Sequence, residues 1–262
     1  MVNLRMNIVS FDQLLTMNIP GVKVVKPEEF FQKIEVVKAA DIVLFPPYYL
    51  LNTIVYALHK SVFPSISTGH LGHSKVEMTR AFQAFCPENM PETLILADSE
   101  TARCRILDEF YFPFIAKEIR SARGCGVKLI ENYDDFIAYA SQNEVLYVQM
   151  LLPIDRDMRI VRIGSEVVAA YYRVAREGSY LNNVYQGGHV IYDEIPSGAI
   201  ELVNKVANQF DIDFAGFDVA EVDGHFYFFE FNNRFGNQAL VNSGCSLEEL
   251  IMKYIINKFK LA

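Results

Sequence analysis

A stretch near the end of the chain, residues 217–232, restricts the fold more than any other, because its pattern predicts two buried strands around a tight polar turn. Its large apolar residues are Phe217, Val219, Phe229 and Phe231. Three polar residues stand among them: Asp218, Glu230 and Asn232. Carboxylates without partners are costly in a buried hairpin, so these side chains are expected to bind something. The alternative interpretation is a surface hairpin with ordinary polar residues.

The length of the turn decides whether these polar groups share a face of the hairpin. Side chains alternate between faces along a strand, so Glu230 and Asn232 lie on one face. A two-residue turn would place Asp218 on the opposite face. A three-residue loop at residues 222–224 would instead pair Asp218 with Phe228 and bring all three groups together, and we predict that loop. Two carboxylates and an amide suit Mg²⁺ held against a nucleoside triphosphate, because this ion takes few carboxylates and completes its shell with phosphates and waters.

The composition disfavours several classes of protein. A chain of 262 residues, 51% of them hydrophobic, with 20 Phe and 14 Tyr, can bury a large core in two or three lobes. Its formal net charge of -8 argues against nucleic acid as a partner, because phosphate backbones require basic surface. We expect no signal peptide, no membrane span and no membrane partner. The four scattered cysteines are typical of a reducing compartment, so we predict a soluble cytoplasmic protein.

The order of the predicted elements indicates an α/β (α+β) fold in three parts. Residues 1–72 alternate strands and helices, which predicts a short Rossmann-like lobe with a parallel sheet. A central lobe is expected over residues 73–152 and a C-terminal lobe over residues 153–262. The predicted strands are 6–11, 22–25, 42–45, 62–67, 93–97, 112–118, 127–130 and 145–151, and the chain is mostly strand from residue 158 onward. The predicted helices are 27–36, 48–59, 74–85, 100–109, 134–140, 198–210 and 246–259.

Further residues could complete a nucleotide site. Lys117 ends an apolar strand and precedes a glycine-containing loop, residues 120–126, whose backbone N–H groups could clamp phosphates. The alternative is an edge lysine beside a solvent loop. Lys75, at the start of a predicted helix, is open to the same two interpretations. The buried strand around residues 148–152 could offer backbone groups and apolar walls to adenine, or belong only to the core.

His70 and His73 have a spacing that could suggest a metal site. No cysteine or carboxylate partner stands near them in the sequence, and Gly69 and Gly72 indicate a loop. We therefore expect a surface histidine or a contact to a second substrate.

The order of these pieces resembles the ATP-grasp superfamily, and most closely its RimK-like branch of carboxylate–amine ligases, typified by glutamate ligases. The likeness covers roughly residues 74–236 and the final helix. The motifs that carry it are Ser74-Lys75, residues 112–117, the loop at 121–127, Val148-Gln149, Asp157-Met158-Arg159 with residues 164–173, Asn183 before residues 186–188, and Asp218 with Glu230-Phe231-Asn232.

The resemblance implies a role for each matching residue. Lys75 and Lys117 would contact phosphates, and the loop with Ser121, Gly124 and Gly126 would close over them. Gln149, Met150 and Leu151 would form the hinge that faces adenine, and Asp157 would hold the ribose hydroxyls. Asp218, Glu230 and Asn232 would bind two Mg²⁺ ions, or Mn²⁺ in their place. Arg173 and Asn183 would stabilise the transferred phosphoryl group and the second substrate. Arg234 could meet a substrate carboxylate or pair with a surface acid.

The implied activity is ligation of a carboxylate to an amine through an acyl phosphate, with release of ADP and phosphate. Alternatives are an ATP-grasp kinase for a small molecule and a nucleotide-binding protein without turnover. The expected substrates are a small carboxylate and an amine, such as an amino acid or a peptide, and a homodimer is a further expectation. The short N-terminal lobe and the ending at residues 232–236 depart from the family pattern, which leaves the substrates open.

Overall fold

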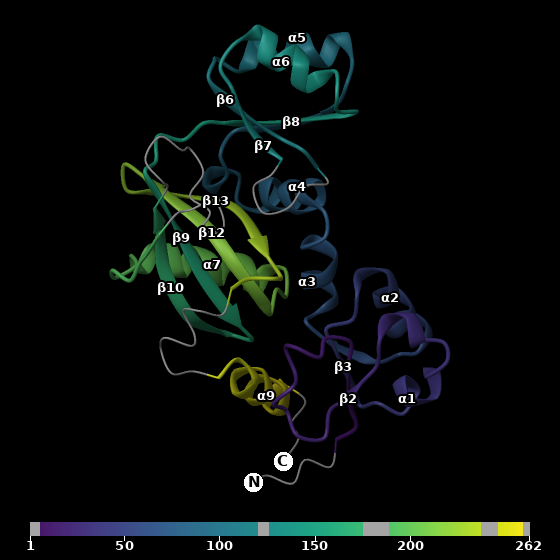
Figure 1. Ribbon diagram of the computed structural model, residues 1–262. Coiled ribbons are helices and arrows are strands. Elements are labelled where there is room, and N and C mark those ends of the chain that lie inside the picture. Colours follow the sequence, from purple (N-terminus) through teal and green to yellow (C-terminus); the bar gives the residue numbers. More distant parts are fainter. Residues whose placement is uncertain (1–5, 120–125, 175–188, 237–245, 259–262) are drawn as a thin grey trace.

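The computed structural model describes residues 6–119, 126–174, 189–236 and 246–258, and these fold into three sheets with helices around them (Figure 1). The strands of one sheet lie within residues 8–63, those of the second within residues 93–150 and those of the third within residues 156–232. The mixture of helices and strands confirms the predicted α/β (α+β) class.

The N-terminal lobe contains a small sheet whose strands all run parallel. In spatial order the strands are β2 (Lys23–Val24), β1 (Ile8–Ser10), β3 (Ile42–Leu44) and β4 (Ser61–Phe63). The helices are η1 (Pro27–Glu29), α1 (Ile34–Lys38), α2 (Tyr48–Asn52) and the π-helix η2 (Thr53–Ala57). β1 and β3 are buried along their whole length, as expected for parallel strands covered on both faces. The predicted parallel sheet is confirmed, although each predicted helix is divided into two shorter ones.

Helix α3 (Ile66–Leu71) is a correction to the prediction, which extended a strand to residue 67. The preceding strand ends at Phe63, and Ser65 caps the helix, because its hydroxyl accepts a hydrogen bond from the Thr68 N–H. Sequence patterns miss α3 because so short a helix shows no apolar period of its own.

The central lobe is an antiparallel sheet with two helices on its outer face (Figure 1). In spatial order the strands are β5 (Thr93–Ala97), β8 (Val145–Met150), β6 (Phe114–Lys117) and β7 (Val127–Ile130). The helices are α5 (Glu100–Glu109) and α6 (Tyr133–Ala140). Phe114 and Phe136 meet in the core between sheet and helices, with ring centroids 5.8 Å apart. Since side chains alternate along a strand, Lys117, Tyr147 and Gln149 point away from that core.

The C-terminal lobe is an antiparallel sheet with one long helix packed on one face. In spatial order the strands are β11 (His189–Ile191), β10 (Glu166–Val174), β9 (Arg156–Ile163), β12 (Phe214–Val222) and β13 (His225–Asn232). Helix α7 (Ser197–Gln209) covers the apolar face, against Ile160 and Phe217. The opposite face carries the polar side chains discussed below.

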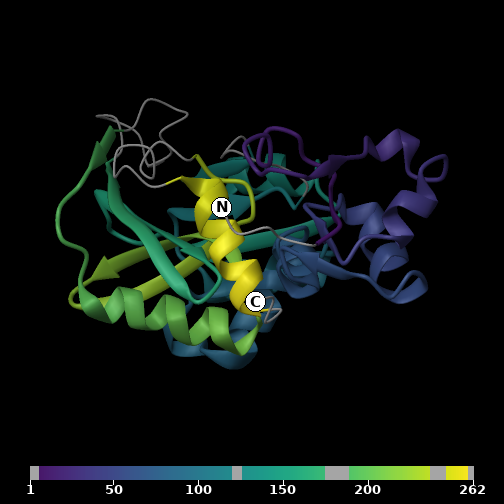
Figure 2. The same ribbon diagram turned by 90° about the horizontal axis from the view of Figure 1, so that it is seen from below.

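Two helices join the lobes. Helix α4 (Lys75–Phe85) packs against the C-terminal sheet, with Phe82 4.7 Å from Phe228 between ring centroids. Helix α9 (Leu247–Lys258) lies between the N-terminal and C-terminal lobes, and its Ile251 belongs to a core shared with both sheets (Figure 2). Predicted lobe boundaries at residues 72 and 152 therefore do not separate the hydrophobic cores.

The hairpin of β12 and β13 has a different turn from the predicted one, but Asp218 and Glu230 share a face as predicted. The turn has two residues, Asp223 and Gly224, both with positive φ (51° and 79°), which is the geometry that an Asp-Gly turn favours. A bulge further along lets Asp218 pair directly with Glu230. The predicted three-residue loop is wrong, but the carboxylates share a face because the bulge shifts the parity of β13.

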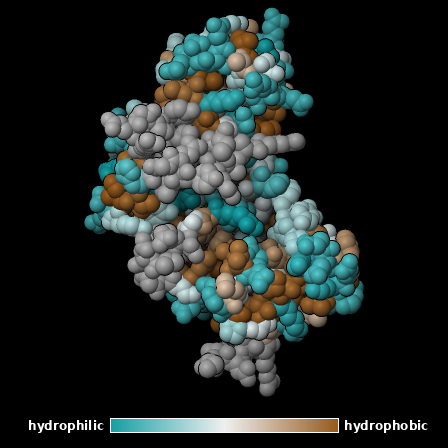
Figure 3. Space-filling model, viewed as in Figure 1, coloured by the Kyte–Doolittle hydropathy of each residue, from teal (hydrophilic) through white to brown (hydrophobic). Residues whose placement is uncertain are grey.

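The surface view shows apolar residues interspersed with hydrophilic ones, with a larger apolar area in the lower part of this face (Figure 3). Leu14 and Met17 of the N-terminal lobe are 80% and 67% exposed. Among the described residues, no helix combines the length and apolar character that crossing a membrane requires.

Candidate active site

Four buried charged side chains form a network on the face of the C-terminal sheet opposite α7. Asp157 and Arg159 lie on β9, Arg173 on β10 and Asp218 on β12. The Arg173 guanidinium donates to both oxygens of Asp157 at 2.7 Å and lies 3.1 Å from Asp218 Oδ2. Arg159 Nε donates to Asp218 Oδ1 at 2.5 Å. The network contains two charges of each sign, which compensates for the loss of hydration.

Burial is the largest single influence on how Asp157 and Arg173 ionise. It raises the pKa of Asp157, and the Arg173 guanidinium acts in the opposite direction. Burial also disfavours the charge on Arg173, but the Asp218 and Asp157 carboxylates outweigh it and raise the pKa of Arg173. The arginine therefore stays positively charged beside any anion that binds this face.

Arg159 belongs to this network, although the sequence analysis named it only within a motif and gave it no role. Its guanidinium lies over Gly216, where an added Cβ would lie 2.9 Å from both Cδ and Nη1 of Arg159. Glycine is therefore needed at this position to leave room for the arginine. A signal was present in the sequence, because residues 157 and 159 of a strand share one face.

The predicted metal ligands lie together on the hairpin. Asp218 is directly opposite Glu230, and Asn232 Nδ2 donates to Glu230 Oε1 at 3.3 Å. Within the described ranges, no group of three or more His, Cys, Asp or Glu side chains could hold a metal. Two carboxylates and one amide still fit Mg²⁺, which needs few protein ligands when phosphates and waters supply the others. Asp218 could share its oxygens between the ion and the arginines, since a carboxylate has four lone-pair positions.

Lys117 reaches from the central sheet to this hairpin. Its Nζ lies 5.4 Å from the Tyr147 ring centroid and 5.9 Å from that of Phe229 on β13. Burial lowers the pKa of Lys117, and the Glu230 and Asp218 carboxylates oppose that shift. Burial likewise lowers the pKa of Lys75, again opposed by Glu230. The two predicted phosphate ligands therefore lie in the electrostatic range of the predicted metal ligands, although they are far apart in the sequence.

The predicted adenine hinge lies at the end of β8. The Gln149 side chain points to Thr93, whose hydroxyl oxygen accepts from Gln149 Nε2 at 2.8 Å. The Met150 N–H donates to the Glu92 carbonyl at 2.8 Å. Both groups are therefore engaged within the central lobe, and the chain leaves the sheet at Leu151. The adenine contact stays a prediction and falls to the backbone at and after Leu151.

Three predicted site residues, Ser121, Gly124 and Asn183, lie outside the described residues. Gly126 is described and buried, and its carbonyl accepts a hydrogen bond of 2.7 Å from the Glu118 N–H. This bond brings together the two chain segments that flank the predicted phosphate loop.

Arg234 lies at the edge of the polar face, two residues beyond Asn232. Its side chain is 83% exposed, and Nη2 lies 3.4 Å from Asp12 Oδ2 in the N-terminal lobe. Arg234 is thus paired with an acidic residue in this structure, and a contact to a substrate carboxylate stays a prediction. The partner belongs to another lobe.

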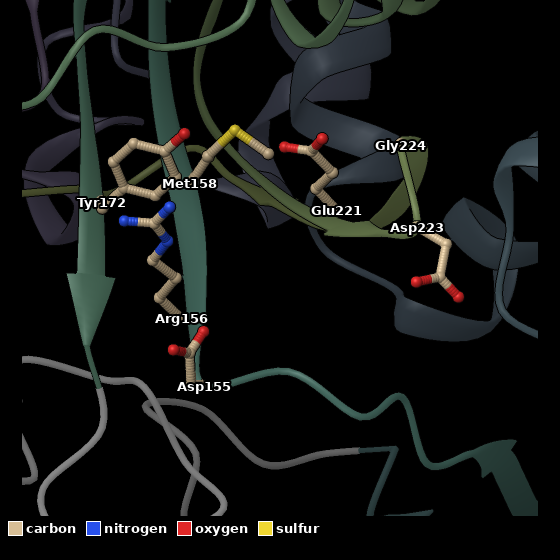
Figure 4. Close-up of a pocket in the computed structure, with 7 residues that line it drawn as sticks. All are labelled: Asp155, Arg156, Met158, Tyr172, Glu221, Asp223 and Gly224. Carbon is tan, nitrogen blue, oxygen red and sulfur yellow. The ribbon is translucent and has the colours of Figure 1, made fainter.

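A pocket of about 290 Å³ lies on the other face of the sheet, away from Asp218 and Glu230, and is lined in part by Asp155, Glu221 and Asp223 (Figure 4). The Arg156 guanidinium stacks on the Tyr172 ring at 4.1 Å from its centroid. Arg156, Met158 and Tyr172 alternate with Asp157, Arg159 and Arg173 along the same strands, so they point the opposite way. This pocket is not part of the polar site.

Comparison with known proteins places this geometry in a family. The model of the RimK-like ATP-grasp domain matches residues 82–255. A relative named coenzyme gamma-F420-2:alpha-L-glutamate ligase from Methanococcus maripaludis is 28% identical over 181 residues, which are 65% of this chain and 61% of that protein. A probable alpha-L-glutamate ligase from Citrobacter koseri is 30% identical over 117 residues, which are 42% of this chain and 39% of that one. The chain thus spans less than two thirds of the length of these relatives.

Solved structures share the fold at low sequence identity. D-alanine–D-alanine ligase from Bacillus anthracis superposes with a TM-score of 0.72 at 14% identity, covering 98% of each chain. A RimK domain ATP-grasp protein from Sphaerobacter thermophilus gives a TM-score of 0.69 at 15% identity, covering 95% of this chain and 99% of that one. The resemblance inferred from the motifs is confirmed, and the chain belongs to the RimK-like ATP-grasp family.

Proposed function

We propose that this chain is an ATP-dependent ligase that joins a carboxylate to an amine through an acyl phosphate and releases ADP and phosphate. The observation that carries the proposal is that Lys117 Nζ, on the central sheet, lies 5.9 Å from the Phe229 ring of the hairpin on which Asp218 stands opposite Glu230. The Glu230 carboxylate acts on the pKa of both Lys117 and Lys75. Phosphoryl transfer requires positioning and charge neutralisation more than covalent chemistry, and this group of residues supplies both.

Each residue has a defined task in this proposal. Lys75 and Lys117 bind the phosphates of ATP, and Arg159 and Arg173 bind the transferred phosphoryl group. Asp218, Glu230 and Asn232 hold two Mg²⁺ ions, or Mn²⁺, which neutralise charge on the phosphates when bound. Asp157 orients the ribose, and the backbone at and after Leu151, next to Gln149 and Met150, borders the adenine. The loop with Ser121, Gly124 and Gly126 excludes water from the acyl phosphate, while Asn183 and Arg234 contact the second substrate.

The names of the relatives support a substrate class. Two of them are named as glutamate ligases. We therefore propose an amino acid or peptide as the amine and a small molecule or protein-borne group as the carboxylate. A homodimer stays a prediction.

The test is a screen for ADP release from Mg-ATP against pooled carboxylates and amines, with hydroxylamine added to trap an acyl phosphate as a hydroxamate. ADP release that requires both pools, together with a hydroxamate from the carboxylate alone, supports the ligase. A stable phosphorylated product would instead identify a kinase. Glu230→Gln should abolish turnover, whereas Glu221→Gln, on the same hairpin but away from the polar site, should retain it. Equal turnover in the two variants would contradict the site.

A further inference from the structure

Helix α4 lies between the central and C-terminal lobes and presents a different stripe of residues to each (Figure 1). Met78 and Phe82 belong to the core of the C-terminal lobe. Lys75, Thr79 and Gln83 recur at intervals of four residues, so they lie along a neighbouring face of the same helix. This second stripe therefore contains a proposed phosphate ligand, Lys75, and two polar residues that have no task in the proposed function.

The two polar residues of this stripe bind the central lobe. The Thr79 hydroxyl lies 2.8 Å from the Tyr147 hydroxyl of β8. One turn further along the helix, Gln83 Nε2 donates to the Thr93 carbonyl of β5 at 2.9 Å. Thr79 and Tyr147 are 2% and 1% exposed. Because both hydroxyls are buried, removal of either one would leave the other without a partner.

Tyr147 also contacts the second proposed phosphate ligand, Lys117. The two residues are cross-strand neighbours, and the Tyr147 ring centroid lies 5.4 Å from Lys117 Nζ. A side chain of α6 fixes the backbone of both, since the Tyr139 hydroxyl accepts the Tyr147 N–H at 3.0 Å and donates to the Lys117 carbonyl at 2.9 Å. The Tyr147 side chain therefore starts from a fixed backbone, contacts Lys117 with its ring and reaches the helix of Lys75 with its hydroxyl.

The two lysines carry like charges that the protein holds close together. Burial lowers the pKa of Lys75, and the Lys117 ammonium group lowers it further. Like charges repel, so a rigid scaffold is needed to keep both ammonium groups at one site until a polyanion neutralises them. Burial raises the pKa of Tyr147, so its hydroxyl keeps the proton and stays neutral between them.

We infer that Tyr147 and Thr79 are positioning residues of the phosphate site, because their hydrogen bond fixes the place of Lys75 relative to Lys117. This inference rests on the proposed function, since the two lysines bind the phosphates of ATP only in that proposal. Tyr147 and Thr79 act through the lysines and not on the reacting atoms. The triphosphate meets two ammonium groups that are already at the required separation, which lowers the cost of ordering them when it binds.

The test measures the affinity of the full chain for Mg²⁺ with AMPPNP, a non-hydrolysable analogue of ATP, by calorimetry. Tyr147→Phe keeps the ring beside Lys117 and removes the hydroxyl, and Thr79→Val removes the other hydroxyl. Each variant should raise the dissociation constant by about 3- to 10-fold, the effect of one lost hydrogen bond. Thr79→Ser keeps the hydroxyl and should bind nearly as the wild type does. Tyr172→Phe, on the other face of the C-terminal sheet, and Thr101→Val, on α5, are matched controls that should bind as the wild type does.

Two double variants separate positioning from a general loss of stability. Tyr147→Phe/Thr79→Val loses the same single bond, so its dissociation constant should rise no further than in the single variants. Lys75→Met removes the lysine that Thr79 positions, so adding Thr79→Val to it should change the dissociation constant by less than about 2-fold. An equal loss from Thr79→Val with and without Lys75 would show a purely structural role and overturn the inference.

The outcomes also distinguish this inference from the proposed function. Wild-type affinity in both Tyr147→Phe and Thr79→Val would overturn the inference and leave the ATP site standing. Failure of the wild type to bind AMPPNP with Mg²⁺ would overturn both. Binding that depends on the two hydroxyls, without ADP release for any carboxylate and amine, would refute the proposed ligase and support the positioning role.

Discussion

Asp218 offers the sharpest test of the buried network, because its charge balances two arginines. The carboxylate accepts from Arg159 at 2.5 and 3.2 Å and lies 3.1 Å from Arg173. Asp218→Asn removes the charge and keeps one oxygen. Arg173 retains its bidentate partner Asp157, whereas Arg159 loses the only carboxylate paired with it among the described residues. We therefore expect a loss of stability even without metal or nucleotide.

The magnitude follows from the burial of the pair. Removing one partner of a buried ion pair costs about 3–5 kcal/mol, and the acceptor that asparagine keeps reduces this to about 2–4 kcal/mol. A chain of this size changes its melting temperature by about 2–4 °C per kcal/mol, so the midpoint should fall by about 5–15 °C. In Asp218→Asn/Arg159→Met the unpaired guanidinium is gone, and the loss should be smaller than the sum of the single losses by about 1–3 kcal/mol.

The assay is thermal unfolding followed by far-ultraviolet circular dichroism in EDTA, since the chain has no tryptophan to report by fluorescence. EDTA removes any contribution of bound metal, so the measurement isolates the arginine contacts. Glu221→Gln, three residues along the same strand and exposed, is the matched control and should melt with the wild type. An unchanged midpoint for Asp218→Asn, or strict additivity in the double variant, would refute the reasoning.

Three further outcomes are expected. Gly216→Ala should displace Arg159, since the new Cβ would lie 2.9 Å from the arginine side chain. The variant should have a lower kcat for ADP release, while its dissociation constant for ATP stays near that of the wild type. An unchanged kcat would contradict the tight fit of Arg159 over Gly216. Burial raises the pKa of Tyr139 from 10.0 to about 12, so only the unfolded chain ionises in that range, and stability should fall as pH rises through it. Tyr139→Phe, compared by thermal melts across the same pH range, should lose less over that interval, and a parallel loss would exclude Tyr139 as a source. Phe82→Ala should lower the free energy of unfolding, measured by denaturant titration, by about 3–5 kcal/mol, because the Phe82 ring on α4 is fully buried against β13. A decrease below about 1 kcal/mol would show that the contact between α4 and β13 can close over the cavity.

Local patterns in the sequence determined most elements of this protein. Helix α5 and strand β7 have the boundaries that their apolar periodicity and flanking residues predict, because neighbouring residues decide the period. Ser74 is another local determinant, because its hydroxyl caps α4 by accepting the Glu77 N–H. The polar residues of the last hairpin and the order of the motifs were also sufficient to predict the family that the comparisons confirm.

Only the tertiary structure decided which distant groups meet. The bulge in β13, the placement of Arg159 over Gly216 and the pairing of Asp12 with Arg234 depend on registers and lobe contacts between segments far apart in the chain. A single-residue shift of register reverses every face of a strand, so a local pattern does not determine such contacts. The sequence by itself therefore specified the kinds of residue at the site and the strands that carry them. The register of the C-terminal sheet decided which buried charges pair, because burial makes an unpaired charge costly and selects the arrangement that neutralises it.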